Sequence, residues 1–218
     1  KLGMPEVTIG FVPDVGGTWL LALAPGELGT HLALTGGTMT GADAIALGFA
    51  DSYVPSVALP ALLDDLERMP AADAIARHAS AVPASDLLTQ RAWVDEAYAG
   101  DESVVIVERL ESSPLAEARA AASVIRGKSP TSVAVALEAL RRAAGLATLE
   151  QVLDQEYRVG LRMLAGADMR EGIRAQVIDK DRTPHWRPPG AGGPRRRAAL
   201  LRAARRARTR AGDATSVS

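Results

Sequence analysis

Cysteine is absent from the 218-residue sequence, which excludes disulfide bonds, thiolate catalysis and Cys-ligated zinc. Histidine is scarce as well. His31, His78 and His185 stand alone, and none has a partner at HxxxH or HExxH spacing. We therefore expect no metal site. The sequence also lacks a signal peptide and an apolar run of 18 residues, so we expect no membrane partner and a cytoplasmic location.

The motifs of several enzyme classes are missing too. No GxGxxG follows a predicted strand, no GxSxG is present, and "GGTMTG" (36–41) lacks the Lys of a phosphate-binding loop. Aromatic residues make up only 4% of the chain, whereas Ala and Leu are abundant. This composition predicts a mostly helical body rather than a strand-rich one.

Charge is divided unevenly along the chain. Nine Arg and one Asp give residues 187–218 a charge of +8, which leaves −9 for residues 1–186, because the whole chain carries −1. An Ala/Arg-rich tail over 188–218 is typical of a disordered or non-native appendage. No aromatic residue is interleaved in it to stack on bases, and the body is acidic, so we expect no nucleic-acid partner.

Capping signals mark several helices. Thr40 and Asp43 have the spacing of a capping box, and Gly48 is placed to end that helix. Ser129 and Pro130 begin a helix that runs to Gly145, with Val133, Leu137 and Leu140 on one face. A further helix after Thr148 carries an apolar stripe. Its members are Leu149, Val152/Leu153, Tyr157, Leu161 and Leu164. The best strand candidate is 50–54.

The segment "MPEVTIGFVPDVGG" (4–17) places two acids among apolar residues, Gly and Pro. On one straight strand Glu6 and Asp14 would stand about 26 Å apart, but Gly10 and Pro13 allow a bend that brings them together. Asp14 is a good helix N-cap in its own right. Glu6 has no helix to cap, so it is either an exposed loop acid or a partly desolvated base with a raised pKa.

Residues 1 to about 188 resemble the crotonase (enoyl-CoA hydratase/isomerase) superfamily. The resemblance is carried first by "MPEVTIGFVPDVGGTWLLALAPGELGTHLALTGGTMTGADAIALGFADSYV". It is carried next by "KSPTSVAVALEALRRA" (128–143), "LEQVLDQEYRV" (149–159) and "DMREGIRAQVIDKDRTPHWRP" (168–188), which are similar to the 3-hydroxyisobutyryl-CoA hydrolase branch. It implies an α/β fold, with part of a spiral core of ββα repeats followed by a mostly α-helical C-terminal region.

The resemblance also implies chemistry. In that branch the acids of the "PE" and "PD.GG" motifs, here Glu6 and Asp14, act on the acyl group of a CoA thioester held in an oxyanion hole. Glu6 would activate water or attack the thioester itself, and Asp14 would orient the water or hold a 3-hydroxyl group. The implied reaction converts 3-hydroxyisobutyryl-CoA to 3-hydroxyisobutyrate and CoA in valine catabolism. CoA enters only as part of the substrate, and no separate cofactor is expected.

Three divisions of the chain follow from the resemblance: the C-terminal half of the core (1–67), the helical region (68–187) and the basic tail (188–218). The upstream half of the core, with an oxyanion-hole donor, is expected to lie outside the chain. Hydratases of the superfamily usually have Gly where Asp14 stands, which favours the hydrolase. An isomerase or hydratase, or an inactive fragment, is the alternative. The superfamily often forms trimers or hexamers, so a homo-oligomer is an open expectation.

Overall fold

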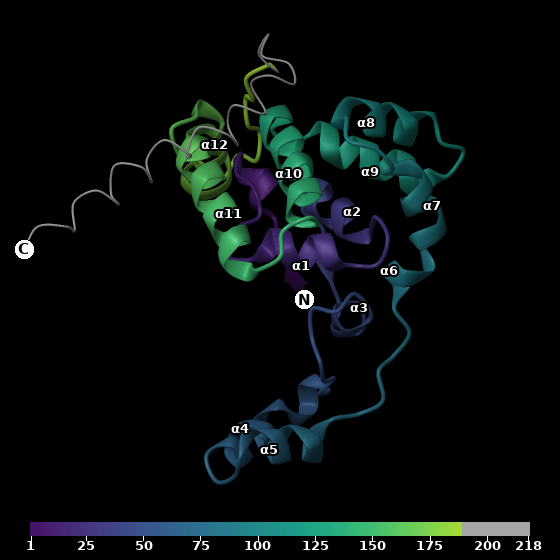
Figure 1. The fold of residues 1–218 in the computed structure, drawn as a ribbon, viewed down its shortest axis with the longest axis vertical. Coiled ribbons are helices and arrows are strands. Elements are labelled where there is room, and N and C mark those ends of the chain that lie inside the picture. The colour runs from purple at the N-terminus through teal and green to yellow at the C-terminus, as the bar shows by residue number, and fades with distance from the viewer. Residues whose placement is uncertain (189–218) are drawn as a thin grey trace, which may run out of the picture.

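The computed structural model describes residues 1–188, and these residues are mostly helical (Figure 1). Two short strands, β1 (Leu2–Gly3) and β2 (Thr38–Met39), pair antiparallel with Leu2 opposite Met39. The α-helices are α1 (Gly17–Leu23), α2 (Leu28–Thr35), α3 (Gly41–Ala46), α4 (Leu59–Leu66), α5 (Ala71–His78), α6 (Asp86–Thr89), α7 (Arg91–Ala97), α8 (Ser103–Ser112), α9 (Ala116–Arg126), α10 (Pro130–Ala143), α11 (Leu149–Leu164) and α12 (Ala167–Ile173). Short turns of 3-10 helix, η1 (Glu6–Ile9) and η2 (Ser56–Ala58), and a π-helical turn, η3 (Arg174–Ile178), complete the set.

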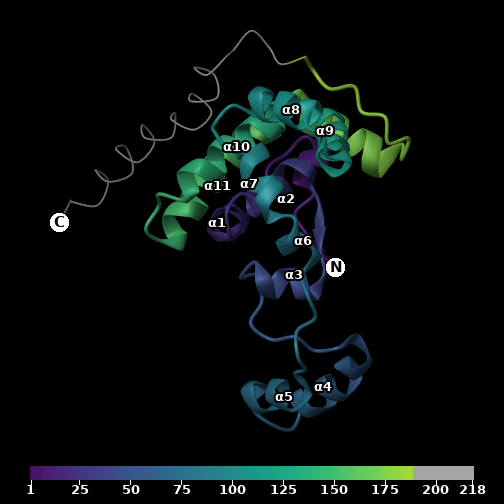
Figure 2. The same ribbon diagram turned by 90° about the vertical axis from the view of Figure 1, so that its right-hand side faces the viewer.

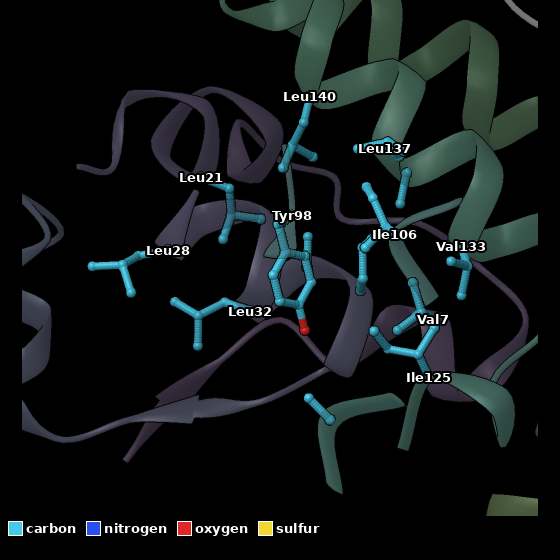
Figure 3. Packing of buried hydrophobic residues seen from close by; sticks show 14 of the residues in the cluster. Val7, Leu21, Leu28, Leu32, Tyr98, Ile106, Ile125, Val133, Leu137 and Leu140 are labelled. Carbon is cyan, nitrogen blue, oxygen red and sulfur yellow. The ribbon is translucent and has the colours of Figure 1, made fainter. Parts of the chain in front are cut away.

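Helix α10 is the centre of the core. It packs against α1, α2, α8, α11 and η1, so that residues from both ends of the described chain share one apolar cluster. Figure 3 shows Val133, Leu137 and Leu140 of α10 beside Val7 and Leu21 from the N-terminal segment. All five side chains are buried. The predicted apolar face of this helix is therefore confirmed, and it holds the N-terminal segment in place.

Helices α4 and α5 form a hairpin that lies apart from this body (Figures 1 and 2). They pack on each other, and α4 has no buried residue. The division expected at residue 67 falls in the turn between these two helices and stays a prediction. The basic tail, except Pro188, lies outside the described residues.

The strand content is lower than expected. Within residues 1–188 the only sheet is the β1–β2 pair, and no ββα repeat is formed. The strand expected at 50–54 is wrong: these residues are irregular. Their backbone is not paired with another strand. The carbonyl of Tyr53 accepts a single hydrogen bond from the N–H of Ser80, and Pro55, which has no N–H, ends the segment. A five-residue segment does not form a strand without a neighbouring strand to pair with.

Two of the helix starts were predicted correctly from capping signals. Thr40 and Asp43 form the predicted capping box of α3, and the Ser129 hydroxyl accepts from Ser132 N at the start of α10. The predicted stripe of α11 is confirmed only at Val152 and is wrong at its other members. Leu149, Leu153, Tyr157, Leu161 and Leu164 are exposed, and the buried residues are Val152, Glu156, Val159, Gly160 and Met163. Gly160 explains this choice, because an added Cβ there would come within 3.2 Å of the Phe11 ring.

Within the described residues no helix is long and apolar enough to cross a membrane.

Candidate active site

The segment 4–17 bends as the Gly and Pro residues predict. Glu6 opens η1, which ends at Gly10 in the left-handed conformation (φ 73°). The N–H of Phe11 then bonds back to Glu6 O at 3.0 Å, which closes the turn. This reversal places Asp14 close enough to Glu6 for its negative charge to act on the Glu6 carboxyl.

Glu6 is half-buried, and its Oε2 is fully enclosed without a hydrogen-bond partner in residues 1–188. Burial raises the pKa of Glu6, and the nearby charge of Asp14 raises the pKa further, while the residue's own backbone N–H lowers it. A carboxylate with a raised pKa and a free oxygen suits a general base or a nucleophile. Of the two environments expected for Glu6, the structure shows the partly desolvated one with a raised pKa.

Asp14 is not the N-cap of α1, contrary to the alternative interpretation from sequence. The cap position belongs to Gly16, and Asp14 contributes only its backbone carbonyl, which accepts from Gly17 N at 2.7 Å. The Asp14 carboxylate is partly exposed and makes no hydrogen bond or ion pair with another of the described residues. It is therefore available for a substrate or water.

The cap of α1 comes instead from Glu156, on α11. Its Oε2 accepts from Gly16 N at 2.7 Å, and its Oε1 accepts from Thr18 N at 2.9 Å and from the Thr18 hydroxyl at 2.5 Å. Glu156 is only 4% exposed. A carboxylate at a helix N-terminus satisfies backbone donors and complements the helix dipole. Glu156 thus caps the N-terminus of α1, the role that the sequence pattern predicted for Asp14.

Glu156 also holds the turn that carries Asp14. Val15 has φ 51° and Gly16 has φ 87°, so a β-branched residue occupies the left-handed region directly after Asp14. Such a conformation costs on the order of 1–3 kcal/mol and persists where neighbouring contacts enforce it. The role of Glu156 was missed from the sequence, although one signal was present. The acid shares a helical face with Val152, Val159 and Met163, where a carboxylate needs a buried partner.

Helix α12 fixes the other acid by backbone contact with η1. A Cβ added at Gly10 would lie 2.5 Å from the carbonyl of Asp168, and one at Gly172 would lie 2.3 Å from that of Ile9. Only glycine permits both approaches. The Asp168 carboxylate is itself used structurally, because it accepts from the Ser129 hydroxyl at 2.6 Å and from Arg187 N at 3.2 Å.

No group of three or more His, Asp or Glu side chains in residues 1–188 is arranged to hold a metal ion. The site offers two unpaired carboxylates: Glu6, placed by the contact of η1 with α12, and Asp14, on the turn that Glu156 holds.

Comparisons with known proteins identify relatives of the chain. The family model described as "Enoyl-CoA hydratase/isomerase" matches residues 1–193. The chain is 34% identical over 196 residues to the mitochondrial 3-hydroxyisobutyryl-CoA hydrolase of Homo sapiens, which covers 85% of the chain and 50% of that protein. It is 33% identical over 203 residues to the small ribosomal subunit protein mS47 of Arabidopsis thaliana, covering 86% of the chain and 49% of that protein.

Two solved structures share the fold. A carnitinyl-CoA dehydratase from Mycobacterium thermoresistibile is 45% identical, with a TM-score of 0.85, over 91% of this chain and 58% of that one. An enoyl-CoA hydratase from Rhodobacter sphaeroides is 42% identical, with a TM-score of 0.81 and the same two coverages. The chain thus spans about half the length of the curated relatives that it matches.

Proposed function

The chain belongs to the enoyl-CoA hydratase/isomerase family, and we propose that it carries the acidic part of the active site of an acyl-CoA thioester hydrolase. The proposed substrate is 3-hydroxyisobutyryl-CoA, as in valine catabolism. One observation carries the proposal: the half-buried carboxylate of Glu6 has a free oxygen and a raised pKa beside the unpaired carboxylate of Asp14. The 3-hydroxyisobutyryl-CoA hydrolases among the relatives support the choice of substrate.

Two routes of hydrolysis are compatible with this geometry. In the first, Glu6 removes a proton from water, the water oxygen attacks the thioester carbonyl, and the C–S bond breaks as CoA leaves and takes up the proton. In the second, a Glu6 oxygen attacks the carbonyl and expels CoA, and water then hydrolyses the resulting anhydride. Both routes need Glu6 to be ionised, and both yield the free acid and CoA.

Asp14 has a separate proposed role. Its carboxylate lies near Glu6 and is not used by any hydrogen bond or ion pair within residues 1–188. It is therefore able to accept a hydrogen bond from the attacking water or from the 3-hydroxyl group of the substrate. The second partner would explain a preference for 3-hydroxyacyl groups, since a substrate without the hydroxyl would leave this acid unpaired.

The test is the release of CoA thiol from 3-hydroxyisobutyryl-CoA by the longest natural polypeptide that contains this chain. Glu6→Gln should reduce kcat at least 100-fold, because the amide is neither a base nor a nucleophile. Glu117→Gln, an exposed acid on α9, serves as the matched control and should leave kcat unchanged. Thiol release by the Glu6→Gln variant at the unaltered rate would remove Glu6 from the mechanism.

Hydration or isomerisation of an enoyl-CoA is the second candidate. It is favoured by the two solved structures, whose names are those of a dehydratase and a hydratase and whose identity to the chain exceeds 40%. The two candidates differ in product. A change in the double bond of the acyl group with the thioester intact would establish the second candidate and exclude the first.

A cytoplasmic location and assembly into a homo-oligomer remain part of this proposal. Some relatives are named as mitochondrial, so cell fractionation tests the location. Light scattering on the purified protein tests the assembly.

A further inference from the structure

A cavity of about 810 Å³ lies where α8, α9, α10, α11 and α12 meet, and neither Glu6 nor Asp14 lines it. We call it the basic cavity, defined by five cationic residues in its wall: Arg126, Lys128, Arg162, Arg170 and Arg187. Its volume is in the range of small-molecule sites. The cations come from separate helices and connections, so the fold, rather than one stretch of sequence, brings them together.

Part of this positive charge is not neutralised by the protein. Arg126 is paired with Glu111 at 2.8 Å. In the described part of the chain, Lys128, Arg162 and Arg170 form no ion pair. The wall also holds two acids, Glu102 and Asp168, and its five cations outnumber them. The cavity therefore carries an excess of positive charge inside an otherwise acidic body.

Two of these cations are half-buried, which sets them apart from a solvated surface patch. Lys128 donates from Nζ to the Thr8 hydroxyl at 2.8 Å, and burial lowers its pKa. Arg162 is also half-buried. Removing a cation from water without an opposite charge is unfavourable, so an anion that enters the cavity gains more from these groups than from exposed ones.

Apart from Ser103 and Thr131, the uncharged part of the wall is apolar. Val107, Ile125, Val133 and Met163 line the cavity and are themselves almost fully buried. None of the described residues that line it is aromatic, so no ring is present to stack on a nucleotide base. An aliphatic floor beneath a cationic rim fits a ligand with an apolar body and an anionic head.

We propose that the basic cavity binds an aliphatic phosphate ester. The phosphate accepts hydrogen bonds from Lys128 and Arg162, and Arg170 lies in the same wall to complete the set. A phosphate dianion suits this arrangement better than a carboxylate, because it has more acceptor oxygens and more charge to share among several donors. The inference does not depend on the proposed hydrolysis, since the acids of that reaction lie outside the cavity.

Isothermal titration of the full chain with hexyl phosphate tests the proposal, with inorganic phosphate and hexanol as probes of the two parts. We expect one equivalent of hexyl phosphate to bind, and each partial probe to bind about tenfold or more weakly. The double variant Lys128→Gln/Arg162→Gln should weaken binding at least tenfold. Arg170→Gln, at an exposed position that does not endanger folding, should weaken it several-fold. Arg142→Gln is the control, because Arg142 is paired with Glu138 and does not line the cavity.

Four results would overturn the proposal. The first is the absence of heat with hexyl phosphate. The second is equal affinity of the wild-type chain and of both cavity variants. The third is a stoichiometry well above one, which would point to the Arg residues after Pro188. The fourth is equal affinity for inorganic phosphate and hexyl phosphate, which would show that the aliphatic wall contributes nothing.

Discussion

At the scale of single residues, hydrogen bonding separates structural acids from chemical ones. Glu156 is buried, and both of its carboxylate oxygens accept from backbone and hydroxyl donors at the start of α1. Glu6 Oε2 has no partner, and the Asp14 carboxylate has none either, within residues 1–188. The protein tolerates an unsatisfied buried oxygen at a cost in stability, and functional sites are where such a cost persists.

The first prediction concerns the pH dependence of catalysis. Because burial and Asp14 raise the pKa of Glu6, the acid limb of the pH profile of kcat/KM should lie above the ordinary range of a glutamate. Activity should rise with pH as Glu6 loses its proton. Asp14→Asn removes one cause of the shift, so the limb should move to lower pH in the residual activity of that variant. An unmoved limb would show that Asp14 does not act on Glu6. An NMR titration of the Glu6 carboxyl measures the same shift without activity.

The second prediction concerns Glu156 as a positioning residue. Glu156→Ala leaves Gly16 N and Thr18 N without their acceptors, which should lower the free energy of unfolding by about 3 kcal/mol. The turn that carries Asp14 then relaxes from its strained conformation. At temperatures where the variant is folded, we therefore expect a decrease in kcat that is larger than any change in KM. Glu117→Gln, an exposed acid on α9, should alter neither the stability nor the kinetic constants. Unchanged kcat in folded Glu156→Ala would mean that this acid serves stability alone.

At the scale of elements, the site depends on backbone contacts between distant segments. Helix α12 touches η1 through Gly10 and Gly172, and α11 touches α1 through Glu156. Glu6 is thus placed by one C-terminal helix and Asp14 by another. The relative position of the two acids is a property of how α11 and α12 pack together.

The third prediction tests the contact between η1 and α12. Gly172→Ala places a methyl group 2.3 Å from the Ile9 carbonyl carbon, so the two elements must separate. We expect a loss of about 1–3 kcal/mol in the free energy of unfolding. Gly145→Ala is the matched control, because its nearest neighbour lies at an ordinary 3.7 Å, and it should change stability by less than about 0.5 kcal/mol. Urea denaturation of both variants gives the comparison, and equal midpoints would contradict the close packing.

Local chemistry explains which elements were predictable from the sequence. The caps at Thr40 and Ser129 are interactions across three residues, and the sequence contains all of their participants. The buried face of α11 depends on Phe11, which packs beside Gly160 from nearly 150 residues away, and no local pattern records that contact. The same holds within the site. The bend between Glu6 and Asp14 followed from Gly10 and Pro13, whereas Glu156 became visible only through the tertiary structure.

At the scale of the whole molecule, one apolar core joins the N-terminal and C-terminal parts of the described chain. The chain spans about half the length of the curated relatives that it matches. The stripe of α11 departs from the expected burial, because all its predicted members except Val152 are exposed. Family membership alone does not decide catalysis, since a ribosomal subunit protein is similar to the same degree as a hydrolase. The unpaired acids, Glu6 and Asp14, are the feature of this chain that argues for chemistry.

The fourth prediction concerns the stability of the whole fold against acid. His31 on α2 lies against α7, with Nδ1 2.8 Å from Tyr98 Oη and its ring edge-on to those of Trp93 and Tyr98. Burial lowers the pKa of His31 to about 4, below its ordinary value of 6.5. The folded chain therefore resists protonation of a group that the unfolded chain protonates readily. It follows that the unfolded state binds more protons between these two pH values.

Stability should consequently fall as pH drops from about 6.5 to about 4, and this contribution should level off below that, with a total loss of up to about 3 kcal/mol. His31→Gln keeps a polar partner for Tyr98 Oη but does not titrate. The difference in unfolding free energy between the wild-type chain and this variant should shrink or reverse across the same interval, when both are unfolded in urea at a series of pH values. Glu171, whose pKa is lowered to about 2 chiefly by Arg174, changes stability mainly below the His31 interval and is common to both proteins. A difference that stays constant from pH 7 to pH 4 would show that His31 is free to take up a proton in the folded state.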